Sequence, residues 1–152
     1  MGSGWLTSDF LTMSEDRGND LHAAIENVLK GPELKLPAGH WVVDKEGHKR
    51  GSVRIKWYED GAGRTYRQHH LGSDDVPDLE MAESDLATID VYPRDAAPVF
   101  VGHYWLTGTP APLAANVACT DYSVAKGGKL VAYRWDGERE LSADKFHWIK
   151  TD

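Results

Sequence analysis

Apolar side chains at helical spacing mark the first 33 residues of the chain. Residues 7–15 contain a cluster of apolar positions with Ser and Asp near its start, which is typical of a short amphipathic helix. In the next stretch apolar residues recur every three or four positions until Gly31, and Asn19 or Asp20 can cap its beginning. The pattern therefore predicts two helices before Gly31.

From residue 34 the apolar spacing changes from helical to alternating. Residues 41–43 and 52–58 carry β-branched and aromatic side chains on either side of a turn-rich segment at 44–49, which predicts a β-hairpin. A further turn before residues 65–67 predicts a third strand of the same meander.

Acidic side chains dominate residues 72–95, where eight acidic residues accompany one basic residue, Arg94. We therefore expect a solvated connection or an exposed helix face here, with a short strand at 88–92.

Strand patterns are densest in the last third of the chain. Apolar runs at 98–101, 116–119 and 129–135 predict strands, and a tight turn at 136–137 leads to a further segment at 139–141 that completes a hairpin. No repeat or low-complexity tract interrupts these elements.

Together the patterns predict an α+β fold in one domain of 152 residues. Its length suits one hydrophobic core. Along the chain the domain divides into a helical segment (1–33), a β-hairpin region (34–71), an acidic connection (72–95) and C-terminal strands (96–152).

The charge balance narrows the classes of partner. The formal net charge is −7, and an acidic surface repels phosphate, so we expect neither nucleic-acid binding nor attachment to a membrane surface. No stretch approaches the ~20 apolar residues of a membrane-spanning helix. The single cysteine, Cys119, excludes an internal disulfide and favours a reducing compartment, so we expect a cytoplasmic protein.

Two local patterns could indicate a binding surface for RNA, sugars or bases. Seven basic residues between positions 45 and 67 are interleaved with aromatic residues, which could form an RNA-binding face, but acidic neighbours dilute them and a solvated sheet face is the expectation. Trp41, Trp57 and Trp135 lie in strand patterns, which favours core positions over a platform for sugars or bases.

Three histidines are candidates for chemistry. His103 follows an apolar strand and Gly102, a position where an imidazole can bind a divalent metal ion or transfer protons; a core histidine is the alternative. His69 and His70 are adjacent, so in a strand they would face opposite sides, and we expect an exposed pair rather than a metal site. Cys119 lies in an apolar strand and is expected to be a buried small hydrophobic residue.

Three segments carry a resemblance to a known family. Residues 98–105 (PVFVGHYW), 116–123 (NVACTDYS) and 127–135 (GGKLVAYRW) resemble the C-terminal end of the calcineurin-like metallophosphoesterases. The similar branch is the bacterial one that groups symmetrical diadenosine tetraphosphatases with serine/threonine protein phosphatases. Residues 30–47 also resemble the inserted region of that branch, so the resemblance implies a partial phosphoesterase sandwich preceded by helices and a β-hairpin insertion.

The resemblance implies a site with two divalent metal ions, of manganese, iron or zinc, acting on a phosphoester substrate. His103 matches a histidine metal ligand of the family. Gly102, Tyr104 and Trp105 would then form the edge of the site, and Asp121 with the glycines at 127–128 would have a structural role.

The other metal ligands of the family come from motifs that this chain lacks. D-x-H-G, G-D-x-x-D-R-G and G-N-H-E are absent; Asp20-Leu21-His22 has the first spacing, but Ala23 replaces the glycine. One histidine cannot hold a catalytic metal ion. We therefore expect a C-terminal portion that is inactive and binds metal weakly by itself, with the missing N-terminal half as its partner. The rival hypothesis is a free-standing β-rich binding module without catalytic activity.

Overall fold

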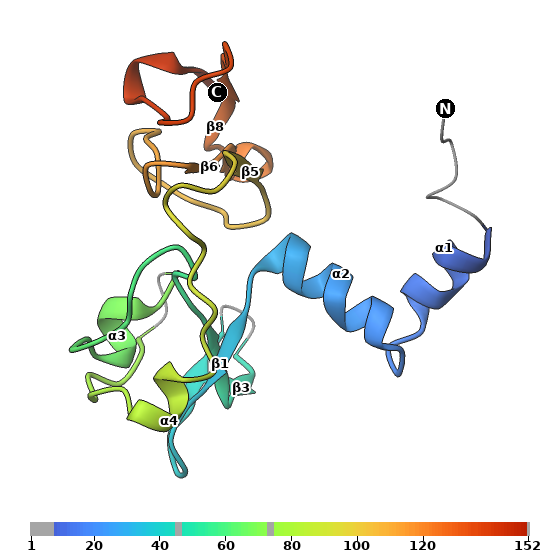
Figure 1. The fold of residues 1–152 in the computed structure, drawn as a ribbon, viewed down its shortest axis with the longest axis vertical. Helices are drawn as coiled ribbons and strands as arrows, with labels where there is room; N and C mark the ends of the chain where they lie inside the picture. Colours follow the sequence, from blue (N-terminus) through green and yellow to red (C-terminus); the bar gives the residue numbers. More distant parts are fainter. Residues whose placement is uncertain (1–7, 45–46, 73–74, 152) are drawn as a thin grey trace.

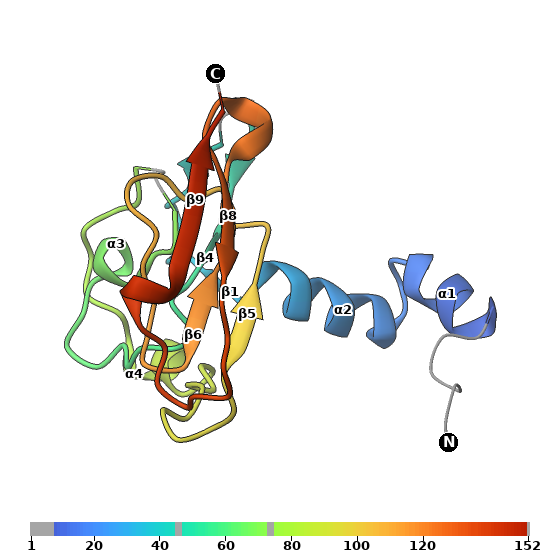
Figure 2. The same cartoon turned by 90° about the horizontal axis from the view of Figure 1, so that it is seen from above.

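The computed structural model describes residues 8–44, 47–72 and 75–151 of the chain. Two helices, α1 (Ser8–Glu15) and α2 (Asp20–Lys30), form an arm that projects from the rest of the molecule (Figures 1 and 2). The side chain of Asn19 accepts the Leu21 N–H at 2.9 Å and starts α2, while Gly31 ends it with a φ of 77°. Both predicted helices are therefore confirmed within the described residues.

Two small antiparallel pairs follow the arm. β1 (Glu33–Lys35) pairs with β4 (Ser52–Arg54), and β2 (Val42–Val43) pairs with β3 (Lys49–Arg50). A strand at 41–43 is confirmed as β2, but its partner β3 begins in the predicted turn, and the expectation that residues 52–58 pair with 41–43 is wrong. β4 pairs with β1 instead, because this register sets buried Leu34 opposite buried Val53.

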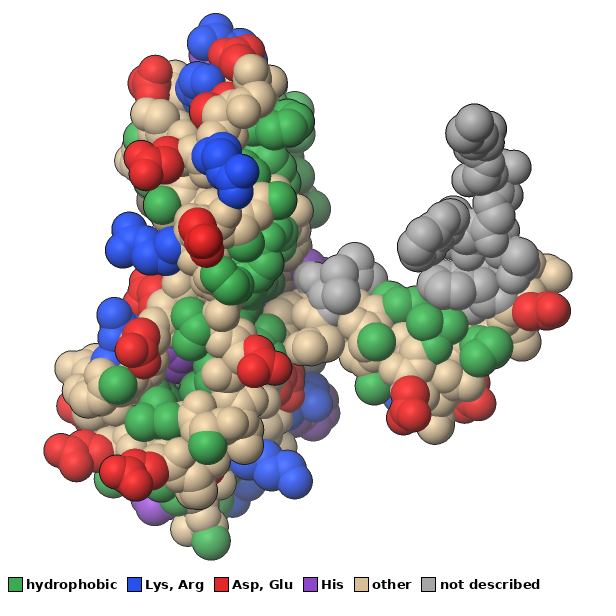
Figure 3. All heavy atoms as spheres, viewed as in Figure 1, with side chains coloured by type: hydrophobic (Ala, Val, Ile, Leu, Met, Phe, Trp, Pro, Cys, Tyr) green, Lys and Arg blue, Asp and Glu red, His purple; other side chains and the backbone are tan. Residues whose placement is uncertain are grey.

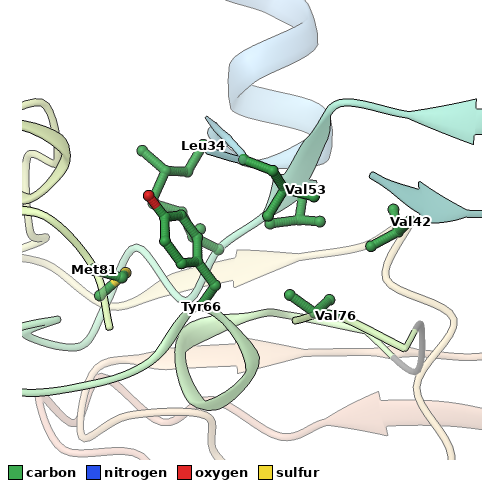
Figure 4. Close-up of a cluster of buried hydrophobic side chains, with 8 residues drawn as sticks. Leu34, Val42, Val53, Tyr66, Val76 and Met81 are labelled. Atoms are coloured by element: carbon green, nitrogen blue, oxygen red, sulfur yellow. The ribbon is translucent and has the colours of Figure 1, made fainter. Parts of the chain in front are cut away.

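A tyrosine lies at the centre of the core that these strands cover (Figure 4). The Tyr66 side chain is 2 % exposed, and its hydroxyl donates to the Asp85 carboxylate. The acidic stretch 72–95 contributes to this core, since Val76 and Met81 are buried, while its described charged side chains other than the half-buried Asp85 are exposed. The buried members of the cluster are Leu34, Leu36, Val42, Val53, Ile55, Tyr66, Val76 and Met81.

Two predicted strands in this part of the chain are wrong. Residues 65–67 begin a short helix, α3 (Tyr66–His69), because Thr65 and Gln68 form a capping box in which each side chain accepts the other's backbone N–H. Residues 88–92 follow the helix α4 (Glu83–Leu86) and form no strand. These residues make local backbone hydrogen bonds instead of ladder bonds, and the Tyr92 N–H donates to the Trp57 carbonyl at 2.9 Å.

The C-terminal part contains two sheets (Figure 2). β5 (Val99–Val101) pairs in parallel with β6 (Val117–Cys119), as expected of strands at those positions. β7 (Asp121–Tyr122), β8 (Lys129–Tyr133) and β9 (Phe146–Lys150) form an antiparallel sheet, with 3₁₀ turns at Val124–Lys126 and Ala143–Lys145.

The expected hairpin from β8 to residues 139–141 is wrong. Leu141 is buried, and its N–H donates to the Ala115 carbonyl at 2.7 Å, so its backbone is not available to β8. β9 takes that place, with Tyr133 opposite Phe146 in the register. The aromatic ring pair they form has centroids 4.9 Å apart and belongs to the second apolar cluster.

The buried cysteine behaves as expected, whereas two tryptophans do not. Cys119 is fully buried, and burial raises the pKa of its thiol to about 11. Trp41 and Trp135 are 48 % and 54 % exposed, so their expected core positions are wrong; Trp41 precedes β2 and Trp135 lies beyond the end of β8. Trp57 is half-buried.

The structure is mixed helix and strand, which confirms the α+β class. Figure 3 shows apolar side chains gathered along one side of the C-terminal part. Separately, the large apolar residues Phe100, Leu130 and Ile149 of this part are exposed. In the part of the chain that the structure describes, no helix has the length and apolar character needed to cross a membrane.

Candidate functional site

The loop after β5 has a strained backbone. His103 and Trp105 have φ angles of 66° and 51°, a left-handed conformation that costs non-glycine residues about 1–3 kcal/mol each. The Asp121 carboxylate stabilises this loop, since its two oxygens accept the N–H groups of Trp105 and Ser123, each at 3.1 Å. Such strain persists where a surrounding structure imposes it and is common at binding and catalytic sites.

Between these two residues, Tyr104 joins the C-terminal part to the segment that follows β4. Its ring is buried, and its hydroxyl accepts a hydrogen bond from Trp57 Nε1 at 2.8 Å. Burial raises the pKa of Tyr104. A Cβ at Gly31 would lie 2.9 Å from this hydroxyl, so glycine is required there both by its φ and by the close approach.

A cleft of about 850 Å³ lies beside this loop. His103, Tyr104 and Trp105 all line it, which brings together three of the four residues expected at the site. Gly102 is exposed and is not among the lining residues, and no atom would lie within 4 Å of a Cβ there. The other lining residues come from β3, β4, α3 and the segments next to them, and the polar ones are Asp44, Arg50, Arg54, Lys56, Tyr58, Arg67 and His70.

The basic residues that line the cleft come from two separate strand pairs and a helix, so they do not form the single sheet face expected from the sequence. Four of the seven between positions 45 and 67 line the cleft, because β4 and the chain reversal through α3 bring distant positions to one side. Two of the four have carboxylate partners: Arg50 pairs with Asp44 at 2.9 Å, and Arg67 with the exposed Asp75 at 3.2 Å. The local charge of the cleft therefore differs in sign from that of the whole chain.

Arg54 and Lys56 have no carboxylate partner among the described residues. The Arg54 guanidinium carbon lies 5.9 Å from the Tyr104 ring centroid, and its Nε is closed off from solvent without a hydrogen-bond partner within the described ranges. Lys56 Nζ donates to the Gln68 carbonyl at 3.0 Å. These two cations carry charge that nothing described near them neutralises.

The adjacent histidines are buried, so the expectation of an exposed pair is wrong. They end α3 rather than lying in a strand, and the Lys56 N–H donates to the His69 carbonyl at 2.9 Å, which holds the helix end against the chain after β4. His70 lines the cleft with its Nδ1 2.9 Å from the Arg54 carbonyl oxygen. His69 is fully buried, and neither ring nitrogen has a hydrogen-bond partner among the residues described.

Burial lowers the pKa of His69, and the charge of Arg64 lowers it further. The His69 side chain therefore binds a proton less readily in the folded protein than in the unfolded chain. The stability contributed by neutral His69 is complete above pH 6.5, the ordinary pKa of the side chain, and is lost as the pH falls below that value.

We expect the free energy of unfolding to decrease by at most about 1.4 kcal/mol per pH unit below pH 6.5 through this one residue. Urea denaturation at several pH values would measure the slope. His69→Leu should flatten it, whereas His40→Asn, at an exposed histidine, should leave it in place. Equal slopes in the wild type and His69→Leu would contradict the expectation.

The residues present do not fit a catalytic metal ion by themselves. Among the described residues, no group of three or more His, Cys, Asp or Glu side chains is placed to hold a metal ion. His103 is exposed at the edge of the cleft and belongs to no such group, and the exposed His40, His48 and His147 do not complete one. A site involving His103 would need further ligands from elsewhere.

Sequence reasoning missed Arg54, Lys56 and His70 as residues of the site. The clustering of basic residues at 45–67 was the available signal, but the pairing of β4 with β1 and the helix at 66–69 decide which of them share a wall. Comparisons of the chain with protein-family models, with curated proteins and with solved structures find no match.

Proposed function

We propose that this chain is the C-terminal part of a metal-dependent phosphoesterase that resembles the calcineurin-like metallophosphoesterases. In this proposal β5 to β9 are the last strands of the catalytic sandwich, and His103 donates one ligand to a divalent ion of manganese, iron or zinc. The observation that carries the proposal is the position of His103: it follows a parallel strand, has a left-handed backbone and lines a cleft with Arg54 and Lys56.

The chemistry of the cleft supports a phosphoester as substrate. Hydrolysis at phosphorus places negative charge on the phosphoryl oxygens, and fixed cations stabilise that charge most where water is partly excluded. Arg54 and Lys56 would hold the phosphoryl group, and the loop at 103–105 would form the opposite edge.

A catalytic metal ion needs at least three protein ligands, so the proposal assigns the others to a polypeptide segment outside this sequence. The chain alone is expected to be inactive. A cytoplasmic location is part of the proposal, supported by the single, buried Cys119.

The test is made on the native assembly. A tagged copy of the chain is expressed in the organism that the protein comes from and is purified together with any polypeptide bound to it. The purified assembly is assayed with p-nitrophenyl phosphate and Mn²⁺. We expect hydrolysis by the captured assembly and none by the purified chain. His103→Ala should lower the rate at least about tenfold, as loss of a metal contact does, whereas His147→Ala on β9 should not.

Two results would contradict the proposal: a captured assembly that is inactive with Mn²⁺, Fe²⁺ and Zn²⁺, or a His103→Ala assembly as active as the wild type. The mass of the captured species adds a second readout, since a longer polypeptide or a stable partner is required.

A free-standing binding module is the second candidate, and the apolar clusters favour it, because one around Tyr66 and another around Phe146 are already buried within this chain. The two candidates differ in what the isolated chain does. A module should unfold cooperatively and remain monomeric, whereas part of a sandwich should expose strand edges and bind hydrophobic dye.

A further inference from the structure

The two-helix arm buries little of its surface against the rest of its own chain. α1 and α2 contact each other, and in the described part of the chain neither contacts another helix or strand more than marginally (Figures 1 and 2). They have 8 and 11 residues, whereas isolated helices shorter than ~12–15 residues are marginal in water. Short helices are stabilised in proteins by packing an apolar face, so the arm requires a partner surface.

The surface of the arm is apolar and acidic. Met13 is 46 % exposed, and Figure 3 shows apolar side chains beside acidic ones on this part of the molecule. Residues 8–30 contain five carboxylates and two cations, hence a formal charge of −3. Glu26 pairs with Lys30. The other four carboxylates have no cationic partner within the described ranges: Asp9, Glu15, Asp16 and Asp20.

This charge decides which kind of surface can cover the arm. Two arms packed against each other would bring like charges together, which disfavours a bundle made of the arms of two copies. A cationic surface with exposed apolar side chains would neutralise the carboxylates and cover the apolar face at the same time. The partner surface is therefore expected to be basic.

A surface with these properties lies at one end of the ladder between β8 and β9. We call its members the lysine patch: Lys126, Lys129, Lys150 and Trp148. Lys129 and Lys150 stand directly opposite each other in the register, an arrangement of like charges that destabilises a sheet. None of the three lysines has a carboxylate partner among the residues described.

Other contacts hold the side chains of the lysine patch in place. Lys126 Nζ lies 3.7 Å from the Trp105 ring centroid, and Lys129 Nζ lies 6.0 Å from that of Trp148. Lys129 also donates a hydrogen bond to the Gly108 carbonyl. Trp148 is 43 % exposed. The lysine patch thus presents positioned ammonium groups around an exposed aromatic ring, which complements the arm in charge and in apolar surface.

We propose that the chain forms a two-fold symmetric dimer in which the arm of each copy packs over the lysine patch of the other. The arm points away from β8 and β9 of its own copy (Figure 2), so the patch that it covers belongs to a second copy. Reciprocal docking makes the same contact twice, and each contact then supplies only half of the ~1,200–2,000 Å² that a stable interface buries. The dimer requires neither His103 nor a further polypeptide, so it goes beyond the proposed function.

Sedimentation equilibrium of the full chain, at concentrations rising to about 0.5 mM, measures the dimer. We expect the wild type to reach two copies and stop there. The reversed-patch variant carries Lys126→Glu and Lys150→Glu, and the reversed-arm variant carries Asp9→Lys and Glu15→Lys; all four side chains are exposed. Each variant alone should dimerise at least about tenfold more weakly, because attraction between arm and patch becomes repulsion.

Mixing the two variants locates the contact. In the mixed dimer an acidic arm meets lysines and a basic arm meets glutamates, so both contacts are attractive again. The mixture should therefore dimerise with nearly the dissociation constant of the wild type. The matched control carries Lys35→Glu and Lys49→Glu, at two exposed lysines outside the lysine patch. It has the same net charge as the reversed-patch variant and should dimerise as the wild type does.

Three results would overturn the proposal. The first is a wild-type chain that stays monomeric, as it would if another polypeptide covered the arm. The second is a reversed-patch variant that dimerises like the wild type, which would indicate packing of arm against arm. The third is a pair of variants that do not associate when mixed, although circular dichroism shows that both are folded.

Each of these results differs from failure of the proposed function, which is read from metal-dependent hydrolysis by the captured assembly and from His103→Ala. The reversed-arm variant, as a monomer, also preserves the contrast between a cooperatively folded module and an aggregating part of a sandwich.

Discussion

Gly128→Ala should lower the free energy of unfolding by at least about 3 kcal/mol, the upper range of overpacking effects. A Cβ at this position would lie 2.0 Å from the Tyr122 carbonyl oxygen and 2.7 Å from that of Ser123. Both neighbours are backbone atoms, which cannot move aside as a flexible side chain does. The Gly128 carbonyl also accepts the Thr151 N–H at 3.2 Å, so a shift would disturb the chain on both sides of β8.

Two other glycines provide a graded control, measured by urea denaturation with tryptophan fluorescence. Gly127 has a φ of 73° but open space around it, so Gly127→Ala should cost about 1–2 kcal/mol from backbone strain alone. Gly51 has neither constraint, and Gly51→Ala should change stability by less than about 0.5 kcal/mol. Equal free energies of unfolding for Gly128→Ala and Gly51→Ala would contradict the close approach of the β7 backbone to Gly128.

Asn116→Ala should destabilise the protein by about 2–4 kcal/mol, because it removes two buried hydrogen bonds and leaves a cavity. The Asn116 side chain is 1 % exposed, and its Nδ2 donates to the carbonyls of Pro93 and Ala96 at 2.8 and 3.2 Å. The backbone carbonyl of Asn116 accepts the Val99 N–H at 2.8 Å. One residue therefore holds the segment before β5 against the start of β6.

Asn116→Asp separates the two contributions to that loss. It keeps the volume but replaces the donor with oxygen atoms that face two carbonyls, so it should be at least as destabilising as Asn116→Ala at pH 7. Asn27→Ala, at an exposed asparagine of α2, is the control and should cost little. A small effect of Asn116→Asp, measured by the same denaturation, would show that the hydrogen bonds to Pro93 and Ala96 contribute little.

Elements whose signals are local could be predicted from the sequence. Asn19 and Gly31 mark the ends of α2, and the apolar runs at 98–101 and 116–119 contain β5 and β6. The strand pattern at 65–67 does not predict α3, although the spacing of Thr65 and Gln68 is that of a capping box.

Partners far apart in the sequence could not be predicted in the same way. β4 could pair with either of two earlier strands, and β8 with either of two later segments; burial of Leu34 against Val53 and of Phe146 beside Tyr133 decides between them. The cleft depends on those pairings. His103, Tyr104 and Trp105 were therefore found as neighbours in sequence, whereas Arg54 was not.

The burial of Cys119 provides a chemical reporter for the stability experiments. It is the single thiol of the chain, it has no solvent-exposed surface, and its raised pKa keeps it in the unreactive protonated form. A maleimide can reach it only when β6 opens. The rate of alkylation therefore ranks the variants by how often this region unfolds. The measurement can be made in crude lysate and without denaturant. It also detects local opening, which a melting curve of the whole chain does not resolve.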